Sequence, residues 1–387
     1  METAIGTPET EGSLGARIAT LEESLIAAAS RPDSEARLSS VRDALVSVTQ
    51  KLGSAATAVQ DARAQADRDI AVTVDDINNT LSDVATLNAK IQSLSAGGRD
   101  ASALIDQRQQ MIDRIATEVP LREVPRDNGT VALFTTGGAV LLDGSAARID
   151  FTPVGTIVPE MTLASGALSG LMINGRPMAT SGETSQISGG RLSSLFAIRD
   201  NLAPNAQAQL DAVARDLIER FANPAVDPTI APGAPGLLTD GGNAFMAANE
   251  TGLAQRLAVN AATDPAQGGA LWRLRDGVGA TAPGSPGASG LIRALSQVLI
   301  APREPASGGF MAGRRSFAAL SGDLISSVSQ SRVQGASEAS FASARLNALQ
   351  EMELQDGVDT DPQLQPLLQL QQTPTANATP MQAVDSI

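Results

Sequence analysis

The chain has 387 residues and a net charge of -14, from 28 Lys and Arg against 42 Asp and Glu. Such an acidic balance argues against binding to nucleic acid, which needs a clustered basic face. The sequence contains neither cysteine nor histidine, which excludes disulfides, thiol nucleophiles, Ser-His-Asp triads and thiolate metal sites. No segment approaches the roughly 18 consecutive apolar residues of a membrane-spanning helix. These exclusions predict a chain without catalytic activity, metal or cofactor.

The first part of the chain, from about Leu14 to Val119, is predicted to be almost entirely helical. A first helix begins at Leu14, where apolar residues start to recur every three or four positions. Pro32 interrupts this pattern, and Asp33 or Ser34 is a suitable N-cap for a second helix.

The second helix carries two apolar stripes, Val41–Val59 and Ile70–Ile91. The span from Ser34 to Ser95 has no proline and one glycine, so it predicts a rod about 90 Å long. A rod of that length favours a coiled coil or an elongated bundle. Asn88 occupies a stripe position, where it is either a buried residue that sets the pairing register or a partly exposed helix position.

A small antiparallel β unit is predicted at residues 121–187, after a further helix that ends before Pro120. Short apolar runs alternate here with hairpin turn signals such as Asp143-Gly144. The candidate strands are Val131–Phe134, Ala139–Leu142, Ala147–Phe151, Ile157–Met161 and Leu171–Asn174.

The order of elements predicts a mainly α fold: an elongated bundle of long helices with a small antiparallel β unit and an irregular α/β insertion. Helical segments from both ends of the chain would form the stem, from which the middle of the chain would project sideways. Short helices are expected in the insertion near 245–258, 268–276 and 289–299, and a long helix from about Arg314 to Gln355. The expected parts are 1–120, the first part of the stem; 121–187, the β unit; 188–221, the second part of the stem; 222–309, the Gly- and Pro-rich insertion; and 310–387, the C-terminal part of the stem.

Two patterns that could bind ligands have simpler interpretations. Residues 277–282 match a dinucleotide-binding pattern, but they follow a helix end without a surrounding βαβ unit, which favours a loop. Asp356, Asp359 and Asp361 lack the remaining oxygen ligands of a calcium loop, and Pro362 indicates a helix start. Paired carboxylates for glycoside hydrolysis stay possible by residue type, although aromatic platforms for a sugar are missing. A surface-binding carbohydrate-active module on residues 121–310 is therefore an alternative.

Four patches, in order along the chain, resemble one protein family. They are Asp76-Ile77-Asn78 to Leu87-Asn88-Ala89-Lys90-Ile91; Gly97-Gly98 with Leu104-Ile105-Asp106-Gln107-Arg108 and Met111-Ile112; Gly189-Gly190-Arg191-Leu192 with Leu195 and Arg199-Asp200-Asn201-Leu202; and Asp356-Gly357-Val358-Asp359-Thr360-Asp361. Together they resemble the flagellar hook-associated protein 1 (FlgK) family, whose members form the junction between hook and filament.

The resemblance implies a structural, extracellular subunit of the bacterial flagellum that joins hook to filament through lateral packing of helices. It implies export through the flagellar type III apparatus, which fits the lack of a cleavable signal peptide at the start of the sequence. The implied partners are the flagellar hook protein, hook-associated protein 3, a flagellar export chaperone and further copies of this chain, with neither nucleic acid nor membrane among them.

The resemblance also singles out residues. The family positions that this sequence matches are Asn78, Asn88, Asp106, Gln107, Arg108, Leu195, Arg199, Asp200, Gly357, Val358 and Asp359. Among these, the polar side chains of segments 106–108 and 199–200 are expected to fix the geometry of the bundle. An Arg–carboxylate pair between these two segments is a hypothesis.

The sequence departs from the family pattern at both ends. We expect Met1 to align inside the pattern, without the N-terminal axial segment of the family. Pro374 and Pro380 interrupt the family's C-terminal helix, and each interior proline costs a helix about 3 kcal/mol. A different axial protein, hook-associated protein 3 or a flagellin, is the alternative within this class, and its matching patches would lie at the chain ends.

Overall fold

The computed structural model describes residues 5, 6, 10, 12–182 and 184–356. The chain divides into two compact units, Met1–Ser326 and Ser327–Ile387. Long helices dominate, and the strands form small antiparallel sheets. The predicted mainly α fold with a small antiparallel β component is therefore confirmed. Among the described residues, no helix combines the length and apolar character needed to cross a bilayer.

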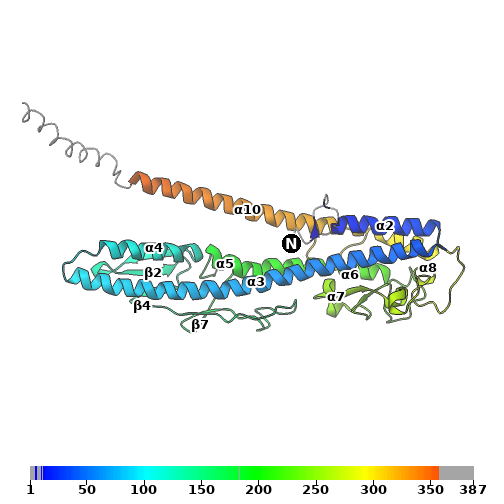
Figure 1. Cartoon of the computed structure of the whole chain (residues 1–387), viewed down its shortest axis with the longest axis horizontal. Helices are drawn as coiled ribbons and strands as arrows, with labels where there is room; N and C mark the ends of the chain where they lie inside the picture. Colours follow the sequence, from blue (N-terminus) through cyan, green and yellow to red (C-terminus); the bar gives the residue numbers. More distant parts are fainter. Residues whose placement is uncertain (1–4, 7–9, 11, 183, 357–387) are drawn as a thin grey trace, which may run out of the picture. The chain divides into compact units, whose positions relative to one another are not determined.

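The longest of the described helices, α3 (Glu35–Ala96), runs without interruption for 62 residues (Figure 1). Ser34 is its N-cap, because the side-chain oxygen accepts a hydrogen bond from the backbone N–H of Arg37. The stripe residues predicted from Val41 to Val59 and from Ile70 to Ile91 are all buried. The predicted rod is confirmed, since buried residues recur on one face from Val41 to Ile91 and keep the helix packed along its length.

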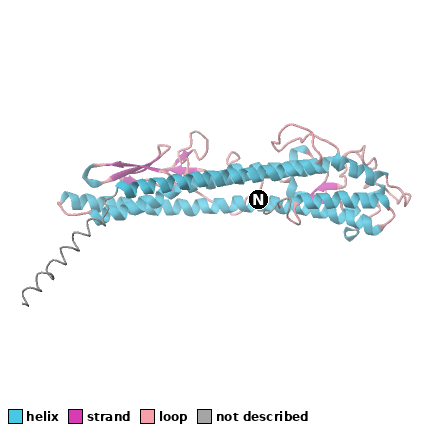
Figure 2. Cartoon of the chain, turned by 90° about the horizontal axis from the view of Figure 1, so that it is seen from above, coloured by secondary structure: helices cyan, strands magenta, loops and turns pink. Residues whose placement is uncertain are grey.

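Other helices of the first unit flank α3 (Figures 1 and 2). Helix α2 runs back along the first part of α3, and α4 runs back along its last part. The segment from α5 to α6 lies along the middle and first part, with a π-helical turn, η2, between the two helices. The bounds are α2 Leu14–Ser30, α4 Ser102–Glu118, α5 Gly190–Ala197, η2 Ile198–Leu202 and α6 Ala203–Phe221.

Two small sheets follow α4 in the sequence, with strand orders β1-β2-β3-β4 and β5-β6-β7. Most of the predicted strand segments contain an observed strand. The predicted strand Ile157–Met161 is wrong: these residues form a loop, and Arg63 of α3 binds two of its carbonyl groups. The strands are β1 Leu121–Pro125, β2 Val131–Thr135, β3 Val140–Asp143, β4 Ser145–Ala146, β5 Ile149–Asp150, β6 Leu171–Ile173 and β7 Arg176–Met178.

The sheets and the helices share one apolar core. Leu133 and Leu171 from the strands are buried together with Leu81 of α3, Ile112 of α4 and Phe196 of α5. The β unit therefore lies along the helices, and the expectation that it projects sideways is wrong. Strands this short cannot bury enough apolar surface by themselves, so their inner faces need the helices as a partner.

The Gly- and Pro-rich insertion also packs against the helices. Arg42 of α3 forms an ion pair with Asp264 at 2.7 Å, and Arg275 donates a hydrogen bond to the carbonyl of Pro32. Helices near the three predicted places are confirmed. The regular elements here are β8 Leu238–Asp240, the 3-10 turn η3 Ala247–Asn249, α7 Leu253–Arg256, β9 Leu257–Val259, the 3-10 turns η4 Ala261–Thr263 and η5 Pro265–Gln267, α8 Arg273–Asp276 and α9 Gly290–Ile300.

The predicted C-terminal helix is confirmed as α10 (Phe317–Asp356), which begins in the first unit and continues into the second. Phe317, Leu320 and Leu324 bury its first turns in the first unit. In the second unit, the described residues belong to this helix, and those from Ser331 to Phe341 are exposed.

Several predictions are not tested by these observations. The side-by-side packing of this C-terminal helix with α3, and the division of the chain into five parts, stay predictions. Gly357, Val358, Asp359 and the two C-terminal prolines lie outside the described residues.

Candidate functional site

One face of α3 carries four polar residues, Arg63, Asp67, Asn78 and Asn88, which we call the polar row. With about 3.6 residues per turn, these four positions fall on one side of the helix: Arg63, Asp67 and Asn88 stand at stripe positions, and Asn78 lies beside the stripe. Each of the four side chains binds backbone groups between residues 131 and 161. The polar row therefore attaches the β unit to the long helix at four places.

Asn88 is buried and binds both backbone groups of a single strand residue. Its Nδ2 donates to the carbonyl of Val131 at 2.9 Å, and its Oδ1 accepts from the N–H of Val131 at 3.3 Å. This double contact is how paired residues bind in an antiparallel sheet, so the Asn88 amide takes the place of a neighbouring strand. Of the two sequence interpretations, the structure supports the buried one, with a strand residue as one partner and Arg108 of helix α4 as a further partner.

Arg108 completes this contact from helix α4. Its Nη1 donates to Oδ1 of Asn88 at 2.9 Å and to the carbonyl of Gly129 at 2.7 Å. Burial lowers the pKa of Arg108, and the charge of Glu123 partly offsets that effect. A buried arginine stays charged at neutral pH, so these two neutral oxygens are needed to solvate it. Asn88 and Arg108 together join α3, α4 and the start of β2.

Asn78 repeats the arrangement at the second sheet. Its Nδ2 donates to the carbonyl of Ile149 at 2.7 Å, and its Oδ1 accepts from the N–H of the same residue at 2.9 Å. Ile149 begins β5, an edge strand whose other neighbour is β6. An edge strand with unpaired backbone groups can pair with other chains, and the Asn78 amide closes this edge.

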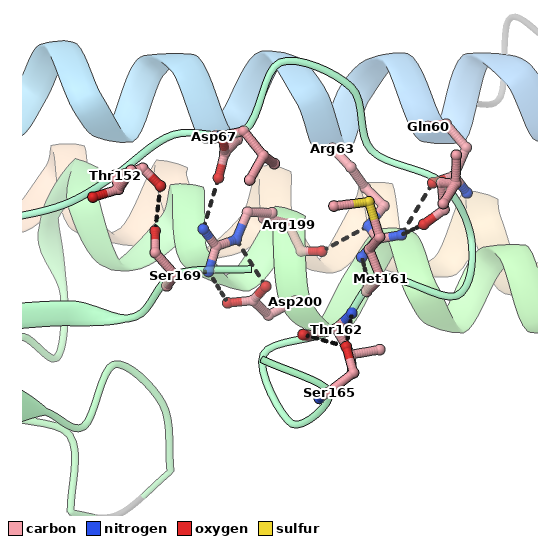
Figure 3. Close-up of polar contacts among 12 residues, drawn as sticks. Gln60, Arg63, Asp67, Thr152, Met161, Thr162, Ser165, Ser169, Arg199 and Asp200 are labelled. Carbon is pink, nitrogen blue, oxygen red and sulfur yellow. Dashed lines mark hydrogen bonds and ion pairs between the residues drawn. The ribbon is translucent and has the colours of Figure 1, made fainter. Parts of the chain in front are cut away.

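A cluster of four charged residues lies farther along the polar row; we call Arg63, Asp67, Arg199 and Asp200 the charge cluster (Figure 3). Arg199 of η2 and Asp67 of α3 form an ion pair of 2.7 Å, with side chains 0% and 1% exposed. Arg199 also holds both carboxylate oxygens of Asp200, at 2.8 and 2.9 Å. The rings of Phe151 and Phe196 lie near its guanidinium, so aromatic faces cover the charge.

Arg63 supplies the second cation of the cluster and donates to four neutral oxygens. It donates to the carbonyls of Arg199 at 3.1 Å, Val158 at 3.3 Å and Met161 at 2.6 Å, and to Oε1 of Gln60 at 3.0 Å (Figure 3). Burial lowers its pKa, which the nearby charge of Asp200 partly offsets. Burial also acts to lower the pKa of Arg199. The contacts with Asp200 and Asp67 outweigh this effect, so the pKa of Arg199 is raised.

The other predicted positions are placed as follows. Asp106 and Gln107 are exposed on α4, whereas Leu195 of α5 is buried. Neither Arg108 nor Arg199 lies in open solvent: the first binds an amide, and the second pairs with a carboxylate of α3 that the sequence analysis did not name. The hypothesised pairing of segments 106–108 and 199–200 is thus replaced by separate contacts of each segment with α3.

Sequence reasoning missed Arg63 and Asp67, although a signal was available. Both are charged residues at stripe positions between Val59 and Ile70, where apolar residues are expected. Charged residues are seldom buried without a partner. Two of them on the buried face of a helix therefore indicate polar contacts with another part of the chain.

A second buried ion pair was missed as well. Arg220 and Asp216 of α6 lie 2.6 Å apart, each with 3% of the side chain exposed. Arg220 also donates to the carbonyls of Ala301, at 2.7 Å, and Arg315, at 3.0 Å. This pair therefore fixes the end of α9 and the residues just before α10.

One hollow in the described part of residues 121–310 bears on the carbohydrate-active alternative. A hollow of about 390 Å³ is lined by residues that include Ile218, Glu219 and Phe245. Its carboxylate, Glu219, is paired with Arg215 and Arg303. Among the described residues, no group of three or more acidic side chains is placed to hold a metal ion.

Comparison with known proteins agrees with the resemblance found in the sequence. Flagellar hook-associated protein 1 of Escherichia coli K12 is 30% identical over 123 residues, which cover 27% of this chain and 22% of that protein. The Salmonella typhimurium protein of the same name is 29% identical over the same shares. The chain thus matches about a fifth of the length of these relatives.

A solved structure and a family model were also matched. The flagellar hook junction protein FlgK from Burkholderia pseudomallei aligns with a TM-score of 0.47 and 20% identity, covering 62% of this chain and 43% of that one. The model of the flagellar hook-associated protein FlgK helical domain matches residues 1–224. Since that match covers more than half of the sequence, the chain belongs to the FlgK helical-domain family.

Proposed function

We propose that this chain is a structural subunit of the bacterial flagellum that joins the hook to the filament. The observation that carries the proposal is the polar row on an uninterrupted helix of 62 residues. It fixes two sheets and the α5–α6 segment to one rod through buried or half-buried, hydrogen-bonded side chains. A subunit between two differently packed tubes has to keep its shape under load, and buried polar contacts with fixed geometry favour a single arrangement.

The partners in this proposal are the hook protein on one side and hook-associated protein 3 on the other, with further copies of the chain beside it. A flagellar export chaperone would bind it before export. The chain would reach the extracellular flagellum through the type III apparatus without a cleavable signal peptide. Family membership supports this assignment over a flagellin or hook-associated protein 3, because the matched model is that of the FlgK helical domain.

The proposal gives the chain no enzymatic role. The buried ionisable groups of the charge cluster are engaged by each other and by backbone carbonyls. Their geometry suits a structural contact, since a general acid or base must be within reach of a substrate proton. The Glu219 hollow, with its carboxylate held by two arginines, gives no specific support to a carbohydrate-active module.

Deletion of the gene in the source bacterium tests the proposal. We expect hooks without filaments under the electron microscope, and filament protein released into the medium. A plasmid copy of the gene should restore attached filaments and swimming. Normal filaments on the deleted strain would contradict the junction role. Hooks that are themselves missing would point to an earlier step of assembly and would contradict it as well.

A further inference from the structure

The segment between β5 and β6, residues 152–169, forms neither helix nor strand, yet buried side chains hold it firmly; we call it the anchored loop (Figure 3). Asp67 accepts a hydrogen bond from the N–H of Val154 at 2.6 Å, and Arg199 donates to the carbonyl of Ser169 at 2.9 Å. Arg63 binds the carbonyls of two further loop residues. Loops are usually mobile because they make few such contacts. This loop is held by several buried side chains, so we expect it to be rigid.

The outermost turn of the anchored loop is also fixed by its own side chains. The N–H of Thr162 donates to Oγ of Ser165 at 3.1 Å, and the N–H of Ser165 donates to Oγ1 of Thr162 at 3.0 Å. This reciprocal pair locks the turn that carries Leu163 and Ala164. Leu163 is 43% exposed, and Val158 of the same loop is 45% exposed. Apolar side chains are thus presented to solvent on a rigid backbone.

The composition of the anchored loop differs from that of the chain. Charged residues make up 18% of the chain, but Glu160 is the one charged residue among positions 152–169. Glu160 acts electrostatically on Arg256, whose pKa it helps to raise, after the larger contribution of Asp240. The remaining exposed residues of the loop are apolar, Gly, Ser, Thr or Pro. Contact surfaces between proteins have cores that are depleted of charge, and rigid loops lose little entropy on binding.

We infer that the anchored loop, with Val158 and Leu163 at its centre, contacts a second copy of this chain in the assembled flagellum. This inference rests on the proposed function, which places copies side by side. Each copy carries a net charge of -14, so two copies repel wherever their acidic surfaces meet. A surface that carries a single charged residue, Glu160, is where like-charged copies can approach at a low electrostatic cost. A basic partner would instead favour the acidic surfaces of the chain.

A photo-crosslinking experiment on purified flagella tests the inference. The chain has no cysteine, so Leu163→Cys introduces a unique thiol for a benzophenone maleimide. The variant replaces the native chain in the source bacterium, and the label is activated in intact flagella. We expect an adduct of twice the chain mass that contains peptides of two copies. An adduct with another flagellar protein, or a label that reacts only within its own chain, would overturn the inference.

Val72→Cys is the matched control, because Val72 is also an exposed apolar residue, at 58%, but lies on α3 outside the loop. It should give at least about tenfold less of the two-copy adduct. Comparable yields from both positions would contradict the assignment to the loop.

A charge-insertion variant gives an independent readout. With the label at Val158→Cys, the additional change Leu163→Glu should lower the two-copy adduct about tenfold or more, because it buries an unpaired charge in the contact. Thermal unfolding of this variant should match that of the native chain, since Leu163 is exposed. An unchanged yield would overturn the inference. Attached filaments together with absent two-copy adducts would refute the loop contact alone, whereas attached filaments in the gene deletion would refute the junction role.

Discussion

Arg199 and Asp67, separated by 132 positions in the sequence, form an ion pair of 2.7 Å between side chains that are 0% and 1% exposed. Each carries a further contact: Arg199 binds Asp200, and Asp67 binds the backbone of Val154. A buried pair stabilises a fold only when both desolvated charges have their remaining hydrogen-bonding groups satisfied. This pair therefore makes helix η2, helix α3 and the anchored loop depend on one another.

Removing one partner of this ion pair should lower the stability of the chain disproportionately, because it leaves the other partner buried without its counter-charge. We expect Asp67→Ala to lower the free energy of unfolding by about 3–5 kcal/mol, because Arg199 and the Val154 N–H lose a buried acceptor. The double variant Asp67→Ala/Arg199→Met should lose less than the sum of the single variants, by about 1–3 kcal/mol. Denaturant unfolding of all four proteins measures this coupling.

The exposed ion pair Arg126–Asp143 is the control for this comparison of single and double variants. Its side chains are each 45% exposed, with the atoms 3.0 Å apart, so we expect a coupling of about 0.2–1 kcal/mol. Equal coupling in the buried and the exposed pair would contradict the role given to burial.

Asn88→Ala should destabilise the chain by about 2–3 kcal/mol, since two backbone groups of Val131 lose their side-chain partner and Nη1 of Arg108 loses one of its two acceptors. Asn79→Ala, at an exposed position on the same helix, should change stability by less than about 0.5 kcal/mol. Hydrogen exchange of the Val131 amide should rise in the first variant and not in the second. If both variants unfold alike, the Asn88 contact has no stabilising role.

Gly190 tests the packing between the end of α4 and the start of α5. It has φ +72, and a Cβ there would lie 2.5 Å from the carbonyl oxygen of Glu118. Gly98 has φ +65 with open space around it. Gly98→Ala should therefore cost about 1–2 kcal/mol from backbone strain alone. Gly190→Ala should cost about 1–3 kcal/mol more, because a backbone atom has to move. Equal midpoints in urea would contradict the close contact.

Asp211 gives the chain a pH-dependent stability. Burial raises its pKa from 3.8 to about 6, although hydrogen bonds from Ala254, Gly252 and Gln207 oppose that rise. The folded state thus binds a proton more tightly than the unfolded state. The stabilisation from this group is complete below pH 3.8 and is lost as pH rises through about 6.

The variant Asp211→Asn isolates this effect, since its side chain does not titrate. Relative to the variant, the native chain should lose about 2.5 kcal/mol of unfolding free energy between pH 4 and pH 7. Asp216, whose pKa burial also raises, is present in both proteins and cancels in the difference. Parallel stability curves over this pH range would show that Asp211 does not titrate there.

The helical part of the fold was predictable because it depends on local periodicity. The stripes of α3 and the N-cap at Ser34 follow from spacing and side-chain chemistry alone. The strand predicted at Ile157–Met161 fails because the buried side chain of Arg63 from α3, rather than a neighbouring strand, binds two backbone carbonyls there. Local sequence contains no information about such a distant donor.

The candidate site was predictable only in part, and for a similar reason. The polar character of Asn88 at a stripe position marked it as unusual, but two of its contacts are with backbone groups of Val131, which leave no trace in the sequence. Arg199 was singled out by family resemblance, whereas its partner Asp67 was not. The available signal was a charged residue, Asp67, at a helix position where buried apolar residues are expected. Its partner could be identified only from the folded structure.

The two asparagine contacts have a mechanical consequence. Asn78 and Asn88 are ten positions apart, which is about 15 Å along the helix axis. Asn88 attaches the first sheet and Asn78 attaches the second, so each sheet has its own fixed point on the same helix. Torque applied to the sheets would then pass directly into the long helix, so the segment would twist as one solid body.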